Sequence, residues 1–315
     1  MKKLFYSMLG YKYKDAVDKQ KNDAYIELSN ICNAKCIFCP YPSIEKTDKK
    51  LQSLDEKTFD RILYFIKSLN CRKISFTPTT GEVFLNKNWH NFVQSALNMK
   101  FINKIHFYSN AILLNEKNIT KLINLDNSNK IQRISFSVGG IDSITYKEMY
   151  KVDKFEKVKN NINLLNKTLK DKEFNTKISC EFRLNKNIKK FDKKTLNSSF
   201  NEINYKYFNI EILDKFANIK FAEASKENLV FLKRPIYTTP CIDLNTFRFA
   251  ADGNIWLCGC VVSELPNDYS LKIGNVYNST VQEILEKQKQ IINKWSLNKT
   301  IPNVCKYCDI YTPRK

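Results

Sequence analysis

The chain of 315 residues carries 52 lysines and arginines against 32 aspartates and glutamates, a formal net charge of +20, and 43% of its residues are hydrophobic. This length and composition allow a sizeable core, in one large or two smaller units. We expect no membrane span, because no apolar run reaches about 18 residues, and no signal peptide, which predicts a cytoplasmic protein.

Six segments alternate apolar and polar residues along the first two thirds of the chain, and helical patterns separate them. The segments are 24–30, 73–79, 104–110, 133–138, 177–184 and 207–213. Between the first two, the apolar residues of one helical stripe are Phe59, Ile62, Leu63 and Ile66. Ser53 and Glu56 stand at capping-box spacing before this stripe. Strand, helix, strand in repetition predicts parallel βαβ units.

Each predicted strand has one polar face, whereas parallel strands covered on both faces are usually apolar throughout. In 104–110, for example, Ile105 and Phe107 oppose His106, Tyr108 and Asn110. Burying these polar groups in a flat sheet would cost roughly 1–3 kcal/mol for each unpaired one. We therefore predict an α/β fold in which the sheet curls into an open, partial (β/α)6 barrel with a polar lumen.

Three thiols follow the first strand in "NICNAKCIFC", at Cys32, Cys36 and Cys39. Ten cysteines in a reducing compartment indicate metal ligands or reactive thiols. A structural zinc site needs four ligands. Three thiolates can instead hold three irons of a [4Fe–4S] cluster and leave the fourth iron open. Zinc or a structural role remains the alternative for these thiols taken alone.

The stretch "ELSNICNAKCIFC" resembles the CX3CXφC signature of the radical S-adenosylmethionine (SAM) superfamily. The resemblance implies a cluster held by Cys32, Cys36 and Cys39, with SAM on the open iron and the ring of Phe38 beside it. It also implies cleavage of SAM to a 5′-deoxyadenosyl radical that abstracts hydrogen from a substrate.

Further motifs follow the next strands. "TTGEVFL" resembles the family's GGE motif, so Gly81 and Glu82 are expected at the SAM ammonium, although Thr80 replaces the first glycine. "FYSNAILL" resembles the SNG-type segment and places Ser109 and Asn110 at the cofactor, with alanine in the position of the glycine.

"ISFSVGG" resembles the fourth-strand segment, in which Ser137 would contact the SAM ribose. Alternation alone points Arg183 into the lumen, where it could meet the SAM carboxylate. Cys71 and Cys180 are interpreted as small core residues. His106 is equally well interpreted as an interior histidine with hydrogen-bond partners or as a catalytic acid or base.

After residue 235 the pattern changes. A hairpin is predicted around Asp252 and Gly253, followed by a helix with Ser279 and Gln282 at capping-box spacing. The order Cys-x11-Gly-x4-Cys, GNV, helix and CxxC resembles the twitch form of the SPASM extension of radical SAM enzymes. This implies a second, auxiliary [4Fe–4S] cluster, with zinc as the alternative. Its implied ligands are Cys241, Cys258, Cys305 and Cys308. We thus predict an extension (1–20), a barrel (21–235) and a twitch domain (236–315).

The resemblance suggests hydrogen abstraction from a carbinol carbon of a sugar or aminocyclitol conjugate. Cys260 is the thiol left after two clusters are assigned, and it favours epimerisation by returning a hydrogen atom; the alternative is a buried small residue or a further cluster ligand. Alternatives are oxidation of the alcohol to a ketone, peptide modification, or a non-enzymatic metal or redox protein.

Flavodoxin or ferredoxin is expected as reductant. The charge of +20 hints at an anionic substrate. Because lysine is spread evenly, we interpret that charge as solvated surface and expect neither nucleic acid nor a membrane as partner.

Overall fold

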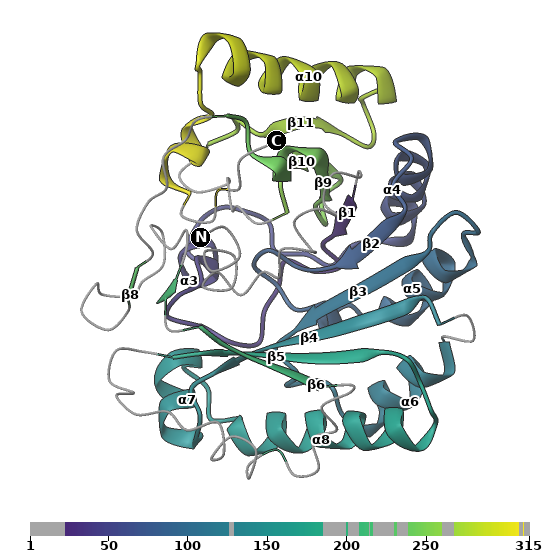
Figure 1. The fold of residues 1–315 in the computed structure, drawn as a ribbon, viewed down its shortest axis with the longest axis vertical. Helices are drawn as coiled ribbons and strands as arrows, with labels where there is room; N and C mark the ends of the chain where they lie inside the picture. The colour runs from purple at the N-terminus through teal and green to yellow at the C-terminus, as the bar shows by residue number, and fades with distance from the viewer. Residues whose placement is uncertain are drawn as a thin grey trace.

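The computed structural model describes residues 23–125, 129–184, 200, 208–213, 215–216, 230–231, 239–259, 268–308 and 311. Six strands follow the predicted segments. They are β1 (Asp23–Ile26), β2 (Lys73–Phe76), β3 (Lys104–Ser109), β4 (Ile131–Gly139), β5 (Lys177–Arg183) and β6 (Phe208–Leu213). Each pairs in parallel with the next, in the order β1-β2-β3-β4-β5-β6. The predicted α/β fold with a mostly parallel sheet is confirmed, and the sheet curves in Figure 1.

Helices cover the outer side of this sheet (Figure 1). They are α4 (Glu56–Ser68), α5 (Trp89–Asn98), α6 (Glu116–Leu125), α7 (Ser143–Tyr150) and α8 (Phe155–Asp171). Short helical turns are α3 (Tyr41–Ile44), η1 (Val83–Leu85), η2 (Ile242–Asn245) and η3 (Asn303–Tyr307). A separate two-stranded pairing joins β7 (Lys215–Phe216) and β8 (Val230–Phe231). No helix in the described ranges is both long and apolar enough to cross a membrane.

The two faces of the sheet differ as the alternation predicts. Ile105 and Phe107 of β3 point toward the helices and are completely buried. His106 and Tyr108, which alternate with them on the other face, keep contact with solvent. Cys71 and Cys180 are also fully buried, which confirms their interpretation as core residues. We call the polar side of the sheet the inner face. On this face His106, Tyr108 and Arg183 keep some contact with solvent, whereas Ser135 and Ser179 are buried.

The carboxy-terminal hairpin joins the same sheet. Strand β9 (Thr246–Phe249) pairs in parallel with β1, and β10 (Asn254–Leu257) and β11 (Lys272–Asn275) continue it in antiparallel pairing. The predicted turn is present, with Gly253 at a φ of +79° that suits glycine. Helix α10 (Val281–Asn298) follows β11. The sheet is therefore continuous across the proposed boundary at 235, and the division into domains stays a prediction.

Both predicted capping boxes were displaced. Helix α4 is capped by Asp55, whose carboxylate accepts the Thr58 N–H at 2.7 Å, so Ser53 and Glu56 form no box. At α10 the box is formed by Thr280 and Glu283, one residue after the predicted pair. In each case the observed cap lies one or two residues after the predicted one and accepts a different backbone N–H, and spacing alone does not choose between such neighbouring side chains.

Candidate functional site

The loop with Cys32, Cys36 and Cys39, which we call the amino-terminal cysteine site, follows β1 at the carboxyl end of the parallel strands. The end of α7 holds this loop, because the N–H groups of Lys35 and Ile37 donate to the carbonyls of Tyr150 and Met149, at 3.1 and 2.9 Å. Within the loop the Cys39 N–H donates to the Cys36 carbonyl. Active sites of parallel β/α barrels form at this end of the strands.

The thiols of this site are half-buried. Burial, and then the negative charge of Glu82, raises the pKa of Cys32 to about 12. The pKa values of Cys36 and Cys39 are also raised, chiefly by burial, while the guanidinium of Arg183 acts in the opposite direction on both. A thiolate here therefore needs positive charge nearby, which a bound metal centre supplies.

Within the described ranges, no three His, Cys, Asp or Glu side chains gather closely enough to hold one metal ion. Four thiolates around one zinc would lie only about 3.8 Å apart, given zinc–sulfur bonds of about 2.3 Å. A four-iron cube takes each thiolate at a different corner, so its ligands stand further apart. The three separate thiols, which affect one another's pKa values, fit the cube better than a single ion.

Glu82 lies beside this loop and is almost fully buried, at 1% exposure. One carboxylate oxygen accepts the Ser109 hydroxyl at 2.7 Å, and the other accepts the Asn110 N–H at 2.8 Å. Burial raises the pKa of Glu82 to about 7, although these bonds lower it. Gly81 has no room for a side chain, since a Cβ would lie 1.9 Å from the carbonyl oxygen of Ser29. Glycine is therefore required there by the neighbouring chain.

Asn110 connects the third strand with the cysteine loop. Its amide nitrogen donates to the Asn33 side chain at 2.7 Å and lies 3.8 Å from the sulfur of Cys32. The next residue, Ala111, adopts a left-handed φ of +60°. The SNG-type segment carries glycine at this position, and the backbone conformation explains that preference.

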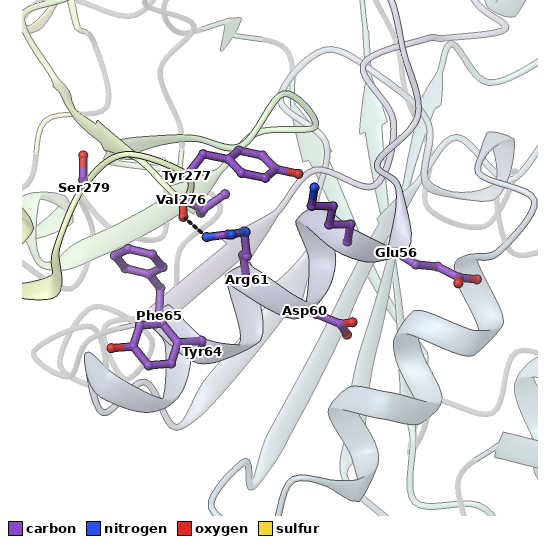
Figure 2. Close-up of a pocket in the computed structure, with 9 residues that line it drawn as sticks. Glu56, Asp60, Arg61, Tyr64, Phe65, Val276, Tyr277 and Ser279 are labelled. Carbon is purple, nitrogen blue, oxygen red and sulfur yellow. Dashed lines mark hydrogen bonds between the residues drawn. The ribbon is translucent and has the colours of Figure 1, made fainter.

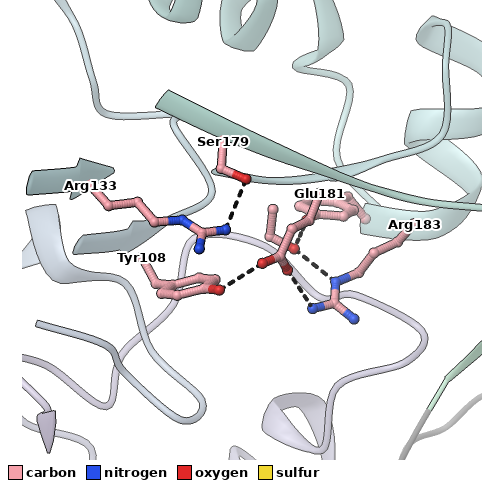
Figure 3. Close-up of polar contacts among 7 residues, drawn as sticks. Tyr108, Arg133, Ser179, Glu181 and Arg183 are labelled. Carbon is pink, nitrogen blue, oxygen red and sulfur yellow. Dashed lines mark hydrogen bonds and ion pairs between the residues drawn. The ribbon is translucent and has the colours of Figure 1, made fainter. Parts of the chain in front are cut away.

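A chain of polar contacts crosses the inner face (Figure 3). The Tyr108 hydroxyl donates to Glu181 at 2.6 Å, and Glu181 forms an ion pair with Arg183 at 3.4 Å. The Arg183 Nε in turn donates to the Ser137 hydroxyl at 2.9 Å. The guanidinium also stacks over the Phe38 ring at 5.1 Å, so this chain ends at the cysteine loop.

The structure thus brings together all the site residues that were predicted for the barrel: Cys32, Cys36, Cys39, Phe38, Gly81, Glu82, Ser109, Asn110, Ser137 and Arg183. No role was predicted for Tyr108, Glu181 or Tyr150. The first two stand on polar strand faces, which is a usable signal. Tyr150 donates to Ser137 at 2.9 Å from the end of α7, and no sequence pattern marks it.

The carboxy-terminal cysteine site comprises Cys241, Cys258, Cys305 and Cys308. Cys241 precedes η2 and β9, and the Cys258 N–H donates to the carbonyl of Thr246, the first residue of β9. Burial raises the pKa of Cys305, and Cys241, Asp268 and Asp243 raise it further. Since Thr246 pairs with Asp23 at the start of β1, this site lies toward the opposite end of the strands from Cys32.

The loop of the carboxy-terminal site touches the inner face. A Cβ at Gly259 would lie 2.6 Å from the ring of Tyr25, a residue of β1. Cys258 itself has a left-handed φ of +69°. Cys260 lies outside the described residues, so its predicted role stays a prediction.

A separate pocket of about 750 Å³ lies outside the barrel, between α4 and the chain that follows β11 (Figure 2). Arg61 stacks on Tyr277 at 4.8 Å, and Thr58 and Tyr277 share a hydrogen bond of 2.7 Å. None of the predicted site residues lines this pocket. Its contacts hold the carboxy-terminal part of the sheet against α4, and the candidate site remains on the inner face.

The chain is similar to several known proteins. Residues 26–178 match the model of the Radical SAM superfamily. GTP 3′,8-cyclase of Desulforamulus reducens is 24% identical over 146 residues, which cover 46% of this chain and 42% of that protein. The match thus spans less than half of this relative.

Two solved structures share the fold. BtrN in complex with AdoMet and 2-DOIA has a TM-score of 0.56 at 15% identity, and the match covers 94% of this chain and 95% of BtrN. SuiB of Streptococcus suis, bound to precursor peptide SuiA, has a TM-score of 0.61 at 14% identity, with 94% and 72% covered.

The fold and the cysteine loop define an α/β protein with a polar inner face and a thiol-rich loop at the carboxyl end of its parallel strands. Residues 26–178, just under half of the chain, form a domain of the radical SAM superfamily. The cofactors of that family are a [4Fe–4S] cluster and SAM.

Proposed function

We propose that this radical SAM enzyme removes a hydrogen atom from a carbinol carbon of a sugar or aminocyclitol conjugate. The observation that carries the proposal is the contact chain from Tyr108 through Glu181 and Arg183 to Ser137. This chain connects side chains suited to hydroxyl groups with the residues expected to contact SAM.

Cys32, Cys36 and Cys39 would hold the first cluster, and Glu82 would accept the ammonium of SAM. When bound, cluster and SAM together supply the 5′-deoxyadenosyl radical that abstracts hydrogen. Asn110 positions Glu82 and the cysteine loop relative to one another, since it bonds to both. Arg183, held by Ser137 and Glu181, offers a cation for the SAM carboxylate.

Tyr108 and Glu181 would receive the substrate hydroxyls. Burial, and then the charge of Glu181, holds the pKa of Tyr108 well above its usual range, so the phenol stays protonated and donates its proton to Glu181. The phenol oxygen and the carboxylate keep lone pairs that can accept further hydrogen bonds. Vicinal hydroxyls of a carbohydrate-like ring match two such acceptors side by side.

The described residues favour oxidation as the outcome. Four thiols suited to an auxiliary [4Fe–4S] cluster adjoin the inner face through Gly259 and Tyr25, and such a centre could take the second electron. Similarity to BtrN, which the match covers almost completely, supports a small polar substrate, whereas over a quarter of the peptide-bound SuiB lies outside the match. Epimerisation is the second candidate and rests on Cys260. We propose flavodoxin or ferredoxin, in the cytoplasm, as the reductant.

Deuterium transfer tests the proposal. Reconstituted enzyme, SAM and reductant would be incubated with a panel of sugars and aminocyclitols deuterated at the carbinol carbons. We expect deuterium in 5′-deoxyadenosine from one substrate position.

Glu181→Gln should lower product formation by at least tenfold while SAM cleavage persists, and Asp60→Asn, a carboxylate on α4, serves as the matched control. Transfer from no member of the panel would contradict the carbinol assignment. A ketone product indicates oxidation, and solvent hydrogen at the same carbon indicates epimerisation.

A further inference from the structure

One phenol hydroxyl beside the amino-terminal cysteine site has no role in the proposed function. Tyr146 lies on α7 and is completely buried, at 0% exposure. Its hydroxyl oxygen is itself buried and has no hydrogen-bond partner among the residues that the structure describes. A buried polar group without a partner costs free energy, so such groups are rare, and they often face a bound group or have a redox or catalytic role.

Helix α7 places this tyrosine against the cysteine loop. The N–H groups on both sides of Cys36, those of Lys35 and Ile37, donate to carbonyls at the end of α7. Cys36 is therefore held at this end of the helix. Tyr146 and Tyr150 stand four residues apart, on one face of α7, and their ring centroids are 4.7 Å apart.

The two tyrosines of this pair differ in their hydrogen bonds. The Tyr150 ring meets the Phe38 ring edge-on at 5.7 Å, and its hydroxyl donates to Ser137 at 2.9 Å. The Tyr146 ring is held by Tyr150 and by Phe155, at 4.7 and 5.9 Å. Because a closely packed ring keeps its hydroxyl in place, the unpaired phenol cannot turn toward another partner without repacking of α7.

The charges that reach the Tyr146 hydroxyl belong to the cysteine site. Burial raises the pKa of this phenol well above its usual range. Next in size are the charges of Cys36, Glu82 and Cys32, which raise this pKa further. Two of these residues are predicted iron ligands, and the third is the carboxylate expected at SAM. The phenol thus lies within electrostatic reach of the first cluster's predicted position, and it can donate one hydrogen bond there.

We propose that the Tyr146 hydroxyl donates a hydrogen bond to a sulfur atom of the first [4Fe–4S] cluster, on the side of Cys36, and thereby raises the reduction potential of that cluster. The inference rests on a cluster at the amino-terminal cysteine site and is independent of the substrate. Reduction places additional negative charge on the cluster, and a hydrogen bond to sulfur in a buried site stabilises that charge. A phenol that is unpaired in the cluster-free chain gives up no other bond in order to make this one.

The variant Tyr146→Phe removes the hydroxyl and keeps the ring. Redox titration of the reconstituted enzyme, followed by electron paramagnetic resonance without SAM or substrate, measures the potential of the first cluster. That signal is the one absent when Cys32, Cys36 and Cys39 are replaced by alanine. We expect the equilibrium constant for reduction to fall about tenfold in Tyr146→Phe, a potential more negative by about 59 mV for a one-electron couple. Tyr64→Phe, which removes an exposed phenol hydroxyl on α4, is the matched control and should leave the potential unchanged.

Two further measurements separate a bond to the cluster from a structural role. Electron–nuclear double resonance of the reduced first cluster should show a proton coupling that is lost when the wild type is transferred to D2O and is absent from Tyr146→Phe. Denaturant unfolding of cluster-free protein should show that Tyr146→Phe is at least as stable as the wild type, because it loses no hydrogen bond. Tyr150→Phe should be less stable, because it loses the bond to Ser137.

An unchanged potential in Tyr146→Phe, or an equal shift in Tyr64→Phe, would overturn the inference. Lower stability of cluster-free Tyr146→Phe would also overturn it, since the hydroxyl would then have a partner in the absence of the cluster. None of these measurements uses a substrate, so they separate the two proposals. Deuterium transfer with an unchanged potential rejects the hydrogen bond alone, and a shifted potential without deuterium transfer rejects the carbinol assignment alone.

Discussion

The two cysteine sites differ in exposure and in the charge around them. The thiols of the amino-terminal site are half-buried, and Arg183 favours ionisation of Cys36 and Cys39 by lowering their pKa values. Cys258, Cys305 and Cys308 of the carboxy-terminal site are 6–7% exposed, and the acids Asp268 and Asp243 oppose ionisation of Cys305.

This difference suggests different tasks. An open site with three thiols and an adjacent cation can admit an anionic group of a further ligand, as SAM binding requires. A site in which three of four thiols are buried, all but Cys241, can saturate a cluster and shield most of it from solvent, which suits electron transfer or structural support.

Removing one site should leave the other intact. The triple variant Cys32→Ala, Cys36→Ala, Cys39→Ala should lose about four of about eight irons and all SAM cleavage. The Cys241→Ala, Cys258→Ala pair should lose the other four and keep SAM cleavage. Iron and sulfide analysis after anaerobic reconstitution measures both. One zinc and four irons in the wild type would contradict the auxiliary cluster, and equal loss of SAM cleavage in both variants would contradict the division of tasks.

The contrast between the sites could be predicted from the sequence only in part. Ligand types, strand order and the polar inner face follow from spacing and alternation, because both are local properties of the chain. The pairing of β9 with β1 could not be predicted, since it joins segments more than 200 residues apart and neither carries a signal for the other. Tyr150 was missed for the same reason, because its contact with Ser137 exists only after α7 packs against β4.

Replacing Glu82 should weaken SAM binding and hardly change the first iron–sulfur cluster. Replacing it by glutamine removes a charge-assisted bond to the ammonium, worth roughly 1.5–3 kcal/mol, and should weaken SAM binding about tenfold or more. The absorption spectrum of the first cluster should stay the same, because the carboxylate of Glu82 accepts hydrogen bonds from Ser109, Asn110 and Phe84 and is not a predicted iron ligand. Asp55→Asn, a carboxylate at the cap of α4, is the control. Unchanged SAM affinity would remove Glu82 from the site.

The raised pKa of Glu82 predicts that the stability of the fold depends on pH. Its folded-state pKa, about 7, lies above the ordinary value of 4.5, so its contribution to stability is complete below about pH 4.5 and is lost as the pH rises through 7. The loss is at most about 3 kcal/mol. Denaturant unfolding of cluster-free protein between pH 5 and about 8 should therefore show a decline that is smaller in Glu82→Gln. Parallel declines in both proteins would show that other groups cause it.

The smallest effect concerns the left-handed residues beside the two sites. Ala111 and Cys258 both have positive φ, at +60° and +69°, where a side chain strains the backbone. At Ala111 glycine should relieve that strain and stabilise the fold by up to about 1 kcal/mol, since its greater freedom in the unfolded chain offsets part of the gain. The Asn161 amide donates to the Ala111 carbonyl at 2.8 Å, a backbone contact that the substitution leaves in place. The temperature of thermal unfolding should therefore rise by a few degrees without a change in SAM cleavage.

Ala96→Gly, in the buried face of α5, is the matched control and should lower stability. A loss of stability in Ala111→Gly as well would mean that the methyl group's packing outweighs the strain. At Cys258 the strain has no such remedy, because the thiol is the predicted ligand, and the backbone there must keep the conformation that the carboxy-terminal site requires.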